Sequence, residues 1–343
     1  MTAPERFLAA CKRLPVDRTP VWMMRQAGRY LPEYRAVRSR VDFLTLCKSP
    51  DLASEVSLQP IERFGMDACV IFSDIMMAVE AMGAPVSFGD GGPHIDDPVR
   101  SMAAVERLRV TDPESSLSYA MEALRLTRAA LRDRAALVGF VGGPFTLAAY
   151  LIEGGGSRLF ATIKTMLYTQ SAVVHALLAK LAEFCALYAA AQVRAGAQVI
   201  QVFDTWAGEL SPAAFEEFAL PYQTKVIGAI RETGAPAIIY VNGCAGKLDL
   251  IAQCNADVVS VDWRLDLRHA RERLGPAVAV QGNVDPCILL SSPLVVSAAA
   301  HEAIDAAGPI GHILNLGHGI LPSTPIECAR AFVEAPKVVG LSA

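Results

Sequence analysis

The feature that most constrains the fold is a repeated alternation along the chain. Short runs of apolar and β-branched residues recur, and a longer segment with helical spacing separates each run from the next. The clear runs are residues 68–72, 136–141, 198–203, 237–241, 257–261, 277–281 and 312–316. Nearly continuous hydrophobicity within a run indicates a strand that is covered on both faces. The sequence therefore predicts an α/β protein with a parallel sheet and helices outside it.

The number of repeats favours a closed sheet. Seven runs are clear, and an eighth would come from a weaker segment, either 86–88 or 21–24. Eight strand–helix units predict a (β/α)8 TIM barrel with an N-terminal extension, residues 1–65. An open doubly wound sheet is the alternative, but no Gly-x-Gly-x-x-Gly motif follows an early strand. Because no charged or Ser/Gly-rich linker divides the chain, we expect residues 1–343 to form one domain.

Hydrophobic residues make up 52% of the chain, which raises the question of a membrane span. The longest uncharged stretch, residues 135–152, is long enough to cross a bilayer. Gly142, Gly143 and Pro144 interrupt it, as expected for a strand, a turn and a helix start. The N-terminus lacks the apolar core of a signal peptide. We therefore expect a soluble, cytoplasmic protein that makes no membrane contact.

Charge is distributed unevenly along a mildly acidic chain. The formal net charge is −4, which excludes the basic field expected of a protein that coats nucleic acid. Within residues 25–40, however, Glu33 is the only acid, whereas five residues are arginine: Arg25, Arg29, Arg35, Arg38 and Arg40. We call residues 20–40 the Arg-rich segment. Its local positive charge is the first indication of function.

The Arg-rich segment has the composition of an anion site. Arg25 and Arg29 are four residues apart, so one face of a helix could present both guanidinium groups. Gly28 weakens such a helix, and Pro32 predicts that it ends shortly beforehand. Several arginines in a short segment suit bidentate binding of carboxylates or phosphates. The alternative is a solvated basic face, although Trp22 and its neighbours are unusually apolar for one.

Two further residues are candidates for chemistry. Asp74 ends an apolar run, where it would serve either as a helix cap or as a buried carboxylate with a raised pKa or a cationic partner. His318 lies between Gly317 and Gly319, which allow close backbone approach to a ligand. No His-x-His or His-x-x-x-His pair occurs, so we expect no metal site. The eight cysteines form no Cys-x-x-Cys pair and are expected to be buried free thiols.

In a TIM barrel the active site lies at the C-terminal ends of the strands. Polar residues in this chain follow most of the predicted strands directly. They are Ser73 and Asp74, Asp204 and Thr205, Asn242, Asp262, Asn283 and Asp285, and Gly317-His318-Gly319. Each is weak evidence alone, because such residues often cap helices. Together they outline a candidate site.

These residues lie within motifs that resemble the uroporphyrinogen decarboxylase family of haem biosynthesis, over almost the whole chain. The most specific motifs are MRQAGRYLPEY at 24–34 and LGHGI at 316–320, found together in this order. The others are LQP at 58–60, FSDI at 72–75, GGPFT at 142–146, Tyr150 with EGGG at 153–156, FDTWAG at 203–208 and QGNVDP at 281–286.

The resemblance implies a (β/α)8 barrel, usually a homodimer, that uses neither a metal nor an organic cofactor. Family members remove carbon dioxide from the four acetate side chains of uroporphyrinogen, a tetrapyrrole, and give coproporphyrinogen. Asp74 would accept hydrogen bonds from the pyrrole N–H groups and stabilise the positive charge that develops on the ring. Arg25 would bind a carboxylate and assist proton delivery.

The remaining site residues implied by the resemblance bind the substrate. Arg29 and Arg38 would contact its acetate or propionate carboxylates. Tyr150, Thr205 and His318 would hydrogen-bond carboxylates or position Asp74. Thr205 stands where some family members have serine, and either hydroxyl can donate. Tyr150 rests on the resemblance alone.

Two other functions remain as alternatives. Corrinoid-dependent methyltransferases resemble this family in fold and use zinc held by a His-x-Cys pair and a later cysteine. Here Asn242 stands where that histidine would lie beside Cys244, and His318 stands where the later cysteine would be. The second alternative is a tetrapyrrole carrier without chemistry, which would need the arginines but not Asp74.

Overall fold

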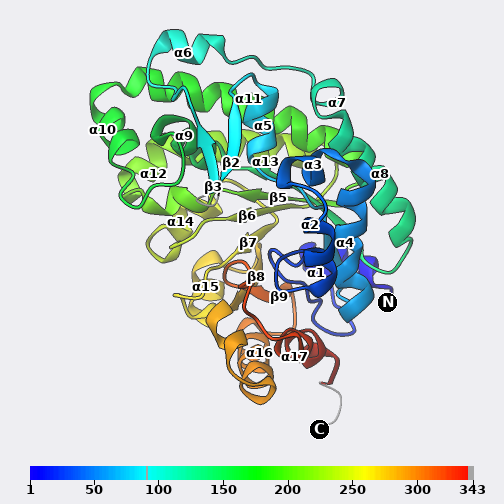
Figure 1. The fold of residues 1–343 in the computed structure, drawn as a ribbon. Helices are drawn as coiled ribbons and strands as arrows, with labels where there is room; N and C mark the ends of the chain where they lie inside the picture. Colours follow the sequence, from blue (N-terminus) through cyan, green and yellow to red (C-terminus); the bar gives the residue numbers. More distant parts are fainter. Residues whose placement is uncertain (90–91, 339–343) are drawn as a thin grey trace.

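The computed structural model describes residues 1–89 and 92–338. Its centre is a curled sheet of seven parallel strands (Figure 1). In spatial order they are β1 (Ala68–Val70), β4 (Ala136–Gly142), β5 (Val199–Phe203), β6 (Ala237–Tyr240), β7 (Val258–Ser260), β8 (Ala279–Val284) and β9 (His312–Leu316). Each strand pairs in parallel with the next one along the chain. All seven predicted strands are thus confirmed, with ends that differ by at most three residues.

A short segment near the N-terminus lies between the two edges of this sheet. Val21 forms a parallel bridge with Leu314 of β9. The Leu314 N–H donates to Pro20 O (2.9 Å), and the Trp22 N–H donates to Leu314 O (3.2 Å). On the other side, the Asp67 N–H donates to Val21 O (2.8 Å), next to β1. Of the two candidates for an eighth strand, 21–24 is therefore the one placed at the sheet.

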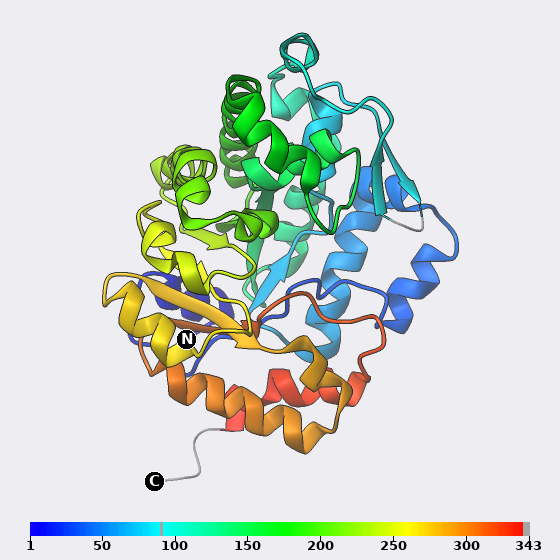
Figure 2. The same ribbon diagram turned by 90° about the vertical axis from the view of Figure 1, so that its left-hand side faces the viewer.

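The other candidate, residues 86–88, forms a separate hairpin. β2 (Val86–Gly89) pairs in antiparallel register with β3 (Gly92–Ile95). The hairpin stands away from the main sheet at the edge of the molecule (Figure 2). It contacts the rest of the chain through α9 and α5 and through a bridge between His94 and Gly155. The prediction of a strand was correct here, but its place in the main sheet was not.

Helices cover the outside of the sheet (Figure 1). Four precede the first strand: α1 (Ala3–Cys11), α2 (Pro32–Arg38), α3 (Phe43–Lys48) and α4 (Pro50–Phe64). The others are α5 (Met76–Ala81), α6 (Met102–Arg107), α7 (Pro113–Ser116), α8 (Ser118–Leu131), α9 (Pro144–Glu153), α10 (Ala161–Thr169), α11 (Ser171–Arg194), α12 (Pro212–Phe218), α13 (Leu220–Glu232), α14 (Leu248–Ala252), α15 (Leu267–Leu274), α16 (Pro293–Ala307) and α17 (Ile326–Val338). Three 3-10 turns are η1 (Thr205–Glu209), η2 (Ala245–Lys247) and η3 (Pro286–Leu290). Although far apart in sequence, α1 and β9 pack together.

Helix α11 is long and apolar enough to cross a membrane, judged by length and composition alone. It packs on β4, α9 and α13, and its leucines 177, 178 and 181 are fully buried. Buried apolar residues at this spacing along one face are typical of a helix packed in the core of a protein. The uncharged stretch 135–152 likewise divides into β4 and α9, at the interruption that the sequence predicted.

The interior of the sheet contains a polar layer that the apolar appearance of the strands did not predict. The Gln281 side chain donates to Gln201 Oε1 (3.1 Å) and to Ser260 Oγ (3.0 Å), and it accepts from the Trp22 indole N–H (2.9 Å). All four side chains are buried. Because β5 and β8 are not neighbours in the sheet, the contact between Gln201 and Gln281 requires the sheet to curl round a common interior.

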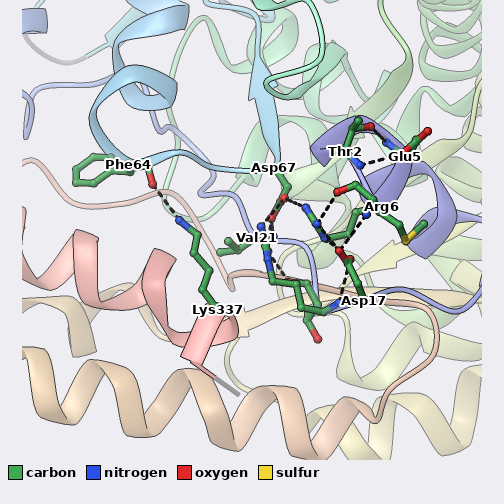
Figure 3. A network of polar contacts seen from close by, with 11 residues as sticks. Thr2, Glu5, Arg6, Asp17, Val21, Phe64, Asp67 and Lys337 are labelled. Atoms are coloured by element: carbon green, nitrogen blue, oxygen red, sulfur yellow. Dashed lines mark hydrogen bonds and ion pairs between the residues drawn. The ribbon is translucent and has the colours of Figure 1, made fainter. Parts of the chain in front are cut away.

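A buried carboxylate fixes the segment that lies between the sheet edges (Figure 3). Asp67 is fully buried and accepts from Arg6 Nη1 (2.8 Å), from Arg18 Nη1 (2.7 Å) and from the Val21 N–H (2.9 Å). Arg6 also pairs with Asp17. Both charge-assisted and backbone hydrogen bonds therefore converge on one carboxylate.

We predict that Asp67→Asn lowers the free energy of unfolding by about 3 kcal/mol, because two guanidinium groups lose a buried partner. Urea unfolding would measure the change. A matched control is Glu114→Gln, which breaks an exposed pair with Arg194 and should cost less than about 1 kcal/mol. Equal losses in the two variants would contradict the importance of the Asp67 cluster.

Candidate functional site

The Arg-rich segment does not carry Arg25 and Arg29 on a helix, so that expectation was wrong. Residues 24–31 form turns and bends, and helix α2 begins only after them. The Met24 N–H donates to Asn315 Oδ1 (2.9 Å), and the Ile320 N–H donates to Met24 O (2.9 Å). These bonds tie the backbone to β9 and to the loop that follows it. Arg25 has φ 62°, which a right-handed helix excludes.

Arg25 extends from this turn across the loop after β9. A Cβ atom on Gly319 would lie 2.3 Å from Arg25 Cδ, so only glycine leaves room for the arginine stem. Gly317 similarly allows the backbone of Trp263 to approach. The Arg25 side chain is exposed and has no hydrogen bond or ion pair within residues 1–89 and 92–338. Its guanidinium group is therefore available to an anion.

Asp74 makes the cap contact that the sequence allowed and keeps one oxygen for another partner. Its Oδ1 accepts from the Met76 N–H (2.8 Å) at the start of α5. Its other oxygen has no hydrogen bond to the described part of the chain. Burial raises the pKa of the Asp74 carboxyl, against the opposing effects of the Met76 N–H and the Arg25 charge. The cap and the functional carboxylate are thus compatible interpretations of the same residue.

His318 is half-buried between two aromatic rings. Its ring lies edge-on to Tyr240 and to Trp263, with centroid distances of 6.1 and 6.3 Å. The Gly319 N–H donates to His318 Nδ1 (2.7 Å). With Nδ1 accepting, a neutral imidazole carries its proton on Nε2, which becomes a donor.

The charge state of His318 follows from its surroundings. Burial lowers the pKa of His318 to about 4, and the positive charges of Arg25 and Arg264 act in the same direction. Asp262 opposes them more weakly. His318 is therefore neutral near pH 7. It can donate a hydrogen bond to a carboxylate without forming an ion pair.

Tyr150 and Thr205 come from neighbouring strand–helix units. Tyr150 lies on α9 and packs against the Trp206 ring, with centroids 4.0 Å apart. Burial and the negative charge of Asp74 raise the pKa of Tyr150 to about 12, so its hydroxyl is a donor at neutral pH. Thr205 begins η1 directly after the fully buried Asp204. Its hydroxyl makes no hydrogen bond in the described part of the chain.

Asp204, which the sequence placed among the candidate site residues, is structural. It accepts from the Thr146 N–H (2.8 Å), the Thr146 hydroxyl (2.7 Å) and the Gln223 side chain (2.8 Å). Gly143 lies so close that a Cβ atom there would meet the Asp204 side chain at 2.2 Å. These contacts fix the turn that presents Thr205.

Arg29 and Arg38 lie beside Tyr34 of α2. Burial raises the pKa of Tyr34, and the charges of Arg38 and Arg29 oppose that rise. Arg38 donates to the Val41 carbonyl and lies over the Phe43 ring. Arg29 is exposed.

The Phe72 ring contacts the Tyr34 ring (5.6 Å) and the Phe43 ring (5.9 Å). Because Phe72 is two residues before Asp74, the two arginines adjoin the loop that carries this carboxylate. They border the site, whereas Arg25 reaches into it.

Sequence reasoning missed residues at the ends of β6 and β7. The Tyr240 hydroxyl donates to Gly317 O (2.9 Å) and lies 3.3 Å from Asn242 Oδ1. Arg264 donates to the same Asn242 oxygen (3.0 Å). Asn242 and Asp262, which directly follow their predicted strands, were among the predicted site residues. Arg264 comes three residues after the predicted strand 257–261, within the distance at which other predicted site residues follow their strands, so its position could have identified it.

The methyltransferase alternative requires a zinc site, and the residues present do not fit one. Within the described ranges, no three His, Cys, Asp or Glu side chains gather closely enough to hold a metal ion. Cys244 is buried, its N–H donates to Asp262 (2.9 Å), and burial raises the pKa of its thiol to about 12. As expected, seven of the eight free cysteines are buried; Cys287 is exposed.

Comparison with known proteins identifies the family. The family model described as uroporphyrinogen decarboxylase (URO-D) matches residues 2–338. A uroporphyrinogen decarboxylase of Myxococcus xanthus is 48% identical over 96% of this chain and 95% of its own length. One from Anaeromyxobacter dehalogenans is 50% identical over 98% of this chain and 99% of its own. The chain belongs to the uroporphyrinogen decarboxylase family.

A solved structure described as a methyltransferase from Methanosarcina mazei superposes with a TM-score of 0.80 over 98% of both chains. At 24% identity this likeness shows a shared fold alone. The resemblance seen in the motifs is confirmed, and the methyltransferase alternative is not favoured, because the curated relatives at about half identity carry the decarboxylase name.

The lowered pKa of His318 predicts a pH effect on stability. Unfolded histidine has a pKa near ~6.5, so between that value and about 4 the unfolded chain binds more protons than the folded one. The stabilising contribution of a neutral His318 is complete above pH ~6.5 and is lost as the pH falls towards 4. We expect wild type to lose more stability than His318→Asn between pH 7 and pH 5, measured by urea unfolding. Parallel losses would show that His318 accepts a proton in the folded protein as readily as in the unfolded chain.

Proposed function

We propose that this protein is a uroporphyrinogen decarboxylase that converts uroporphyrinogen III to coproporphyrinogen III without a metal or organic cofactor. The observation that carries the proposal is that Asp74 and Arg25 lie close enough for the Arg25 charge to act on the Asp74 carboxyl. Within the described residues, Asp74 has one carboxylate oxygen without a hydrogen bond, and Arg25 has a guanidinium group without an ion pair. A porphyrinogen has both complementary groups, since its pyrrole N–H groups are donors and its side chains end in carboxylates.

The chemistry needs an electron sink, and the pyrrole ring supplies one. A proton added to the ring α-carbon gives a cation. The electron pair of the breaking carbon–carboxylate bond then flows into that cation as carbon dioxide leaves. A second proton converts the exocyclic carbon to a methyl group while the ring proton is returned. The net change for each acetate is uptake of one proton and loss of carbon dioxide.

Asp74 is suited to stabilise this cation. Its Oδ1 is held by the Met76 N–H, and its other oxygen has no hydrogen bond to the described part of the chain. A carboxylate that is partly removed from water interacts more strongly with a nearby positive charge. Arg25 opposes the rise in the pKa of Asp74 and so favours its ionised form. We assign Asp74 the role of accepting the pyrrole N–H groups.

The other site residues bind the carboxylates. We assign Arg25 to the reacting acetate, where it assists delivery of the proton that replaces carbon dioxide. Arg29 and Arg38 bind carboxylates at the border of the site. Neutral donors complete the set: Tyr150, Thr205 and His318.

The bonds of residues 20–22 with both sheet edges support a further proposal on architecture. We infer that this segment takes the eighth place of a (β/α)8 barrel. On this reading the chain is a single domain whose N-terminal residues 1–65 contribute both the closing segment and the Arg-rich segment. A cytoplasmic homodimer is proposed from the resemblance.

A product assay tests the activity. We expect the purified protein, treated with a chelator and supplied with no cofactor, to convert uroporphyrinogen III to coproporphyrinogen III under reducing, anaerobic conditions. Chromatography of the oxidised products separates porphyrins by their number of carboxylates. Unchanged eight-carboxylate substrate, or activity that returns only with added zinc, would overturn the proposal.

Replacing Asp74 by asparagine tests its role. We expect Asp74→Asn to lower kcat by about 10²–10³-fold, with little change in KM, because the charge matters most when the ring becomes cationic. The matched control is Asp112→Asn, since Asp112 also accepts from a backbone N–H two residues ahead, at the start of α7. Near-normal turnover in Asp74→Asn would reduce Asp74 to a helix cap.

A further inference from the structure

Arg264 lies in the loop between β7 and α15, at the same end of the sheet as His318. Its guanidinium group stacks over the Trp263 ring, 4.0 Å from the ring centroid. The same ring meets His318 edge-on, with the ring centroids 6.3 Å apart. Trp263 therefore contacts both Arg264 and His318, a residue of the proposed substrate site.

The loop that carries Arg264 is held by side chains on neighbouring strands. Asp262 is fully buried and accepts from the Cys244 N–H (2.9 Å) and from the Arg264 N–H (3.0 Å). The Asn283 amide donates to Asp262 O (3.0 Å) and to Leu265 O (2.6 Å). The backbone at Arg264 is thus fixed on both sides, which preorganises its side chain for binding.

Within the described part of the chain, the guanidinium group donates hydrogen bonds from only one of its nitrogen atoms. Nη1 donates to Asn242 Oδ1 (3.0 Å) and lies 3.3 Å from Asp262 Oδ1. Nε and Nη2 have no hydrogen-bond partner among residues 1–89 and 92–338, and half of the side chain is exposed. The Nε–Nη2 edge is one of the two edges through which arginine binds a carboxylate bidentately.

The ion pair with the buried Asp262 does not by itself account for this arrangement, because it involves only Nη1 of the guanidinium group. Asp262 also has two backbone N–H partners without the guanidinium group. In addition, the Arg264 charge reaches the site, since it contributes to lowering the pKa of His318.

We propose that Arg264 binds a peripheral carboxylate of the porphyrinogen through its Nε–Nη2 edge, as a substrate-binding residue beyond those of the Arg-rich segment. The inference rests on the proposed function. The substrate carries eight carboxylates, and at each step the ring being processed lies at Asp74. Carboxylates on the other rings then extend outward and need partners away from Asp74. Arg264 meets this need, because it is exposed, rigidly held and adjacent to the loop that carries His318.

The test compares Arg264→Ala and Arg264→Lys with wild type in steady-state kinetics with uroporphyrinogen III. A contact made equally in the ground state and the transition state affects KM and leaves kcat unchanged. We expect Arg264→Ala to raise KM about tenfold, in keeping with the loss of a charge-assisted hydrogen bond, with kcat within about twofold. Arg264→Lys should show a smaller rise in KM, because lysine keeps the charge and loses the planar edge.

The matched control is Arg268→Ala, which removes the same charge four residues later on the exposed face of α15 and should leave KM unchanged. An active wild type with an unaltered KM in Arg264→Ala would overturn this inference alone. A fall in kcat and in the urea midpoint of Arg264→Ala at constant KM would also overturn it, in favour of a structural role. Absence of product from wild type would overturn the proposed function and this inference with it.

Discussion

The Asp67 carboxylate is the constraint on which the arrangement of the site depends. It is buried at the start of the sheet, where it would be costly without the two arginines and the Val21 N–H that bind it. Those bonds hold residues 20–22 against β1, while the same segment bonds to β9 on its other side. The position of Arg25 follows, because it is only four residues further along the chain. A cluster at one end of the strands thereby determines where a cation is placed at the other end.

The site combines cations that are free to bind with donors that burial keeps neutral. Burial lowers the pKa of His318 and raises that of Tyr150, so both are uncharged donors near pH 7. Burial also raises the pKa of Asp74, and Arg25 limits that rise. The proposed site thus combines one carboxylate, Asp74, with groups suited to bind anions. A ligand with central N–H groups and peripheral carboxylates meets all of these requirements at once.

Much of the fold was predictable, because burial on both faces of a parallel strand leaves a continuous apolar run. All seven clear strands were found in this way. The segment at 21–24 was only one of two candidates, since its place depends on bonds to Leu314 and Asp67 that are remote in sequence. The helix expected at Arg25 and Arg29 was wrong for the same reason: Asn315 and Ile320 bind the Met24 backbone and hold it in a turn. Arg264 was missed because its bond to Asn242 and its effect on His318 join residues from separate strand–helix units.

The sequence by itself determined the repeated strand–helix pattern, the gathering of arginines near the N-terminus and the motifs of the family, because these are properties of residue order. The tertiary structure alone decided which oxygen of Asp74 remains free, why His318 is neutral and which arginines have unpaired nitrogen atoms. These properties depend on desolvation and on neighbours brought together from separate strands. Gly319 is an example of this difference. The sequence indicates only that a glycine allows close approach of another group, whereas the folded chain shows that this group is the Arg25 side chain.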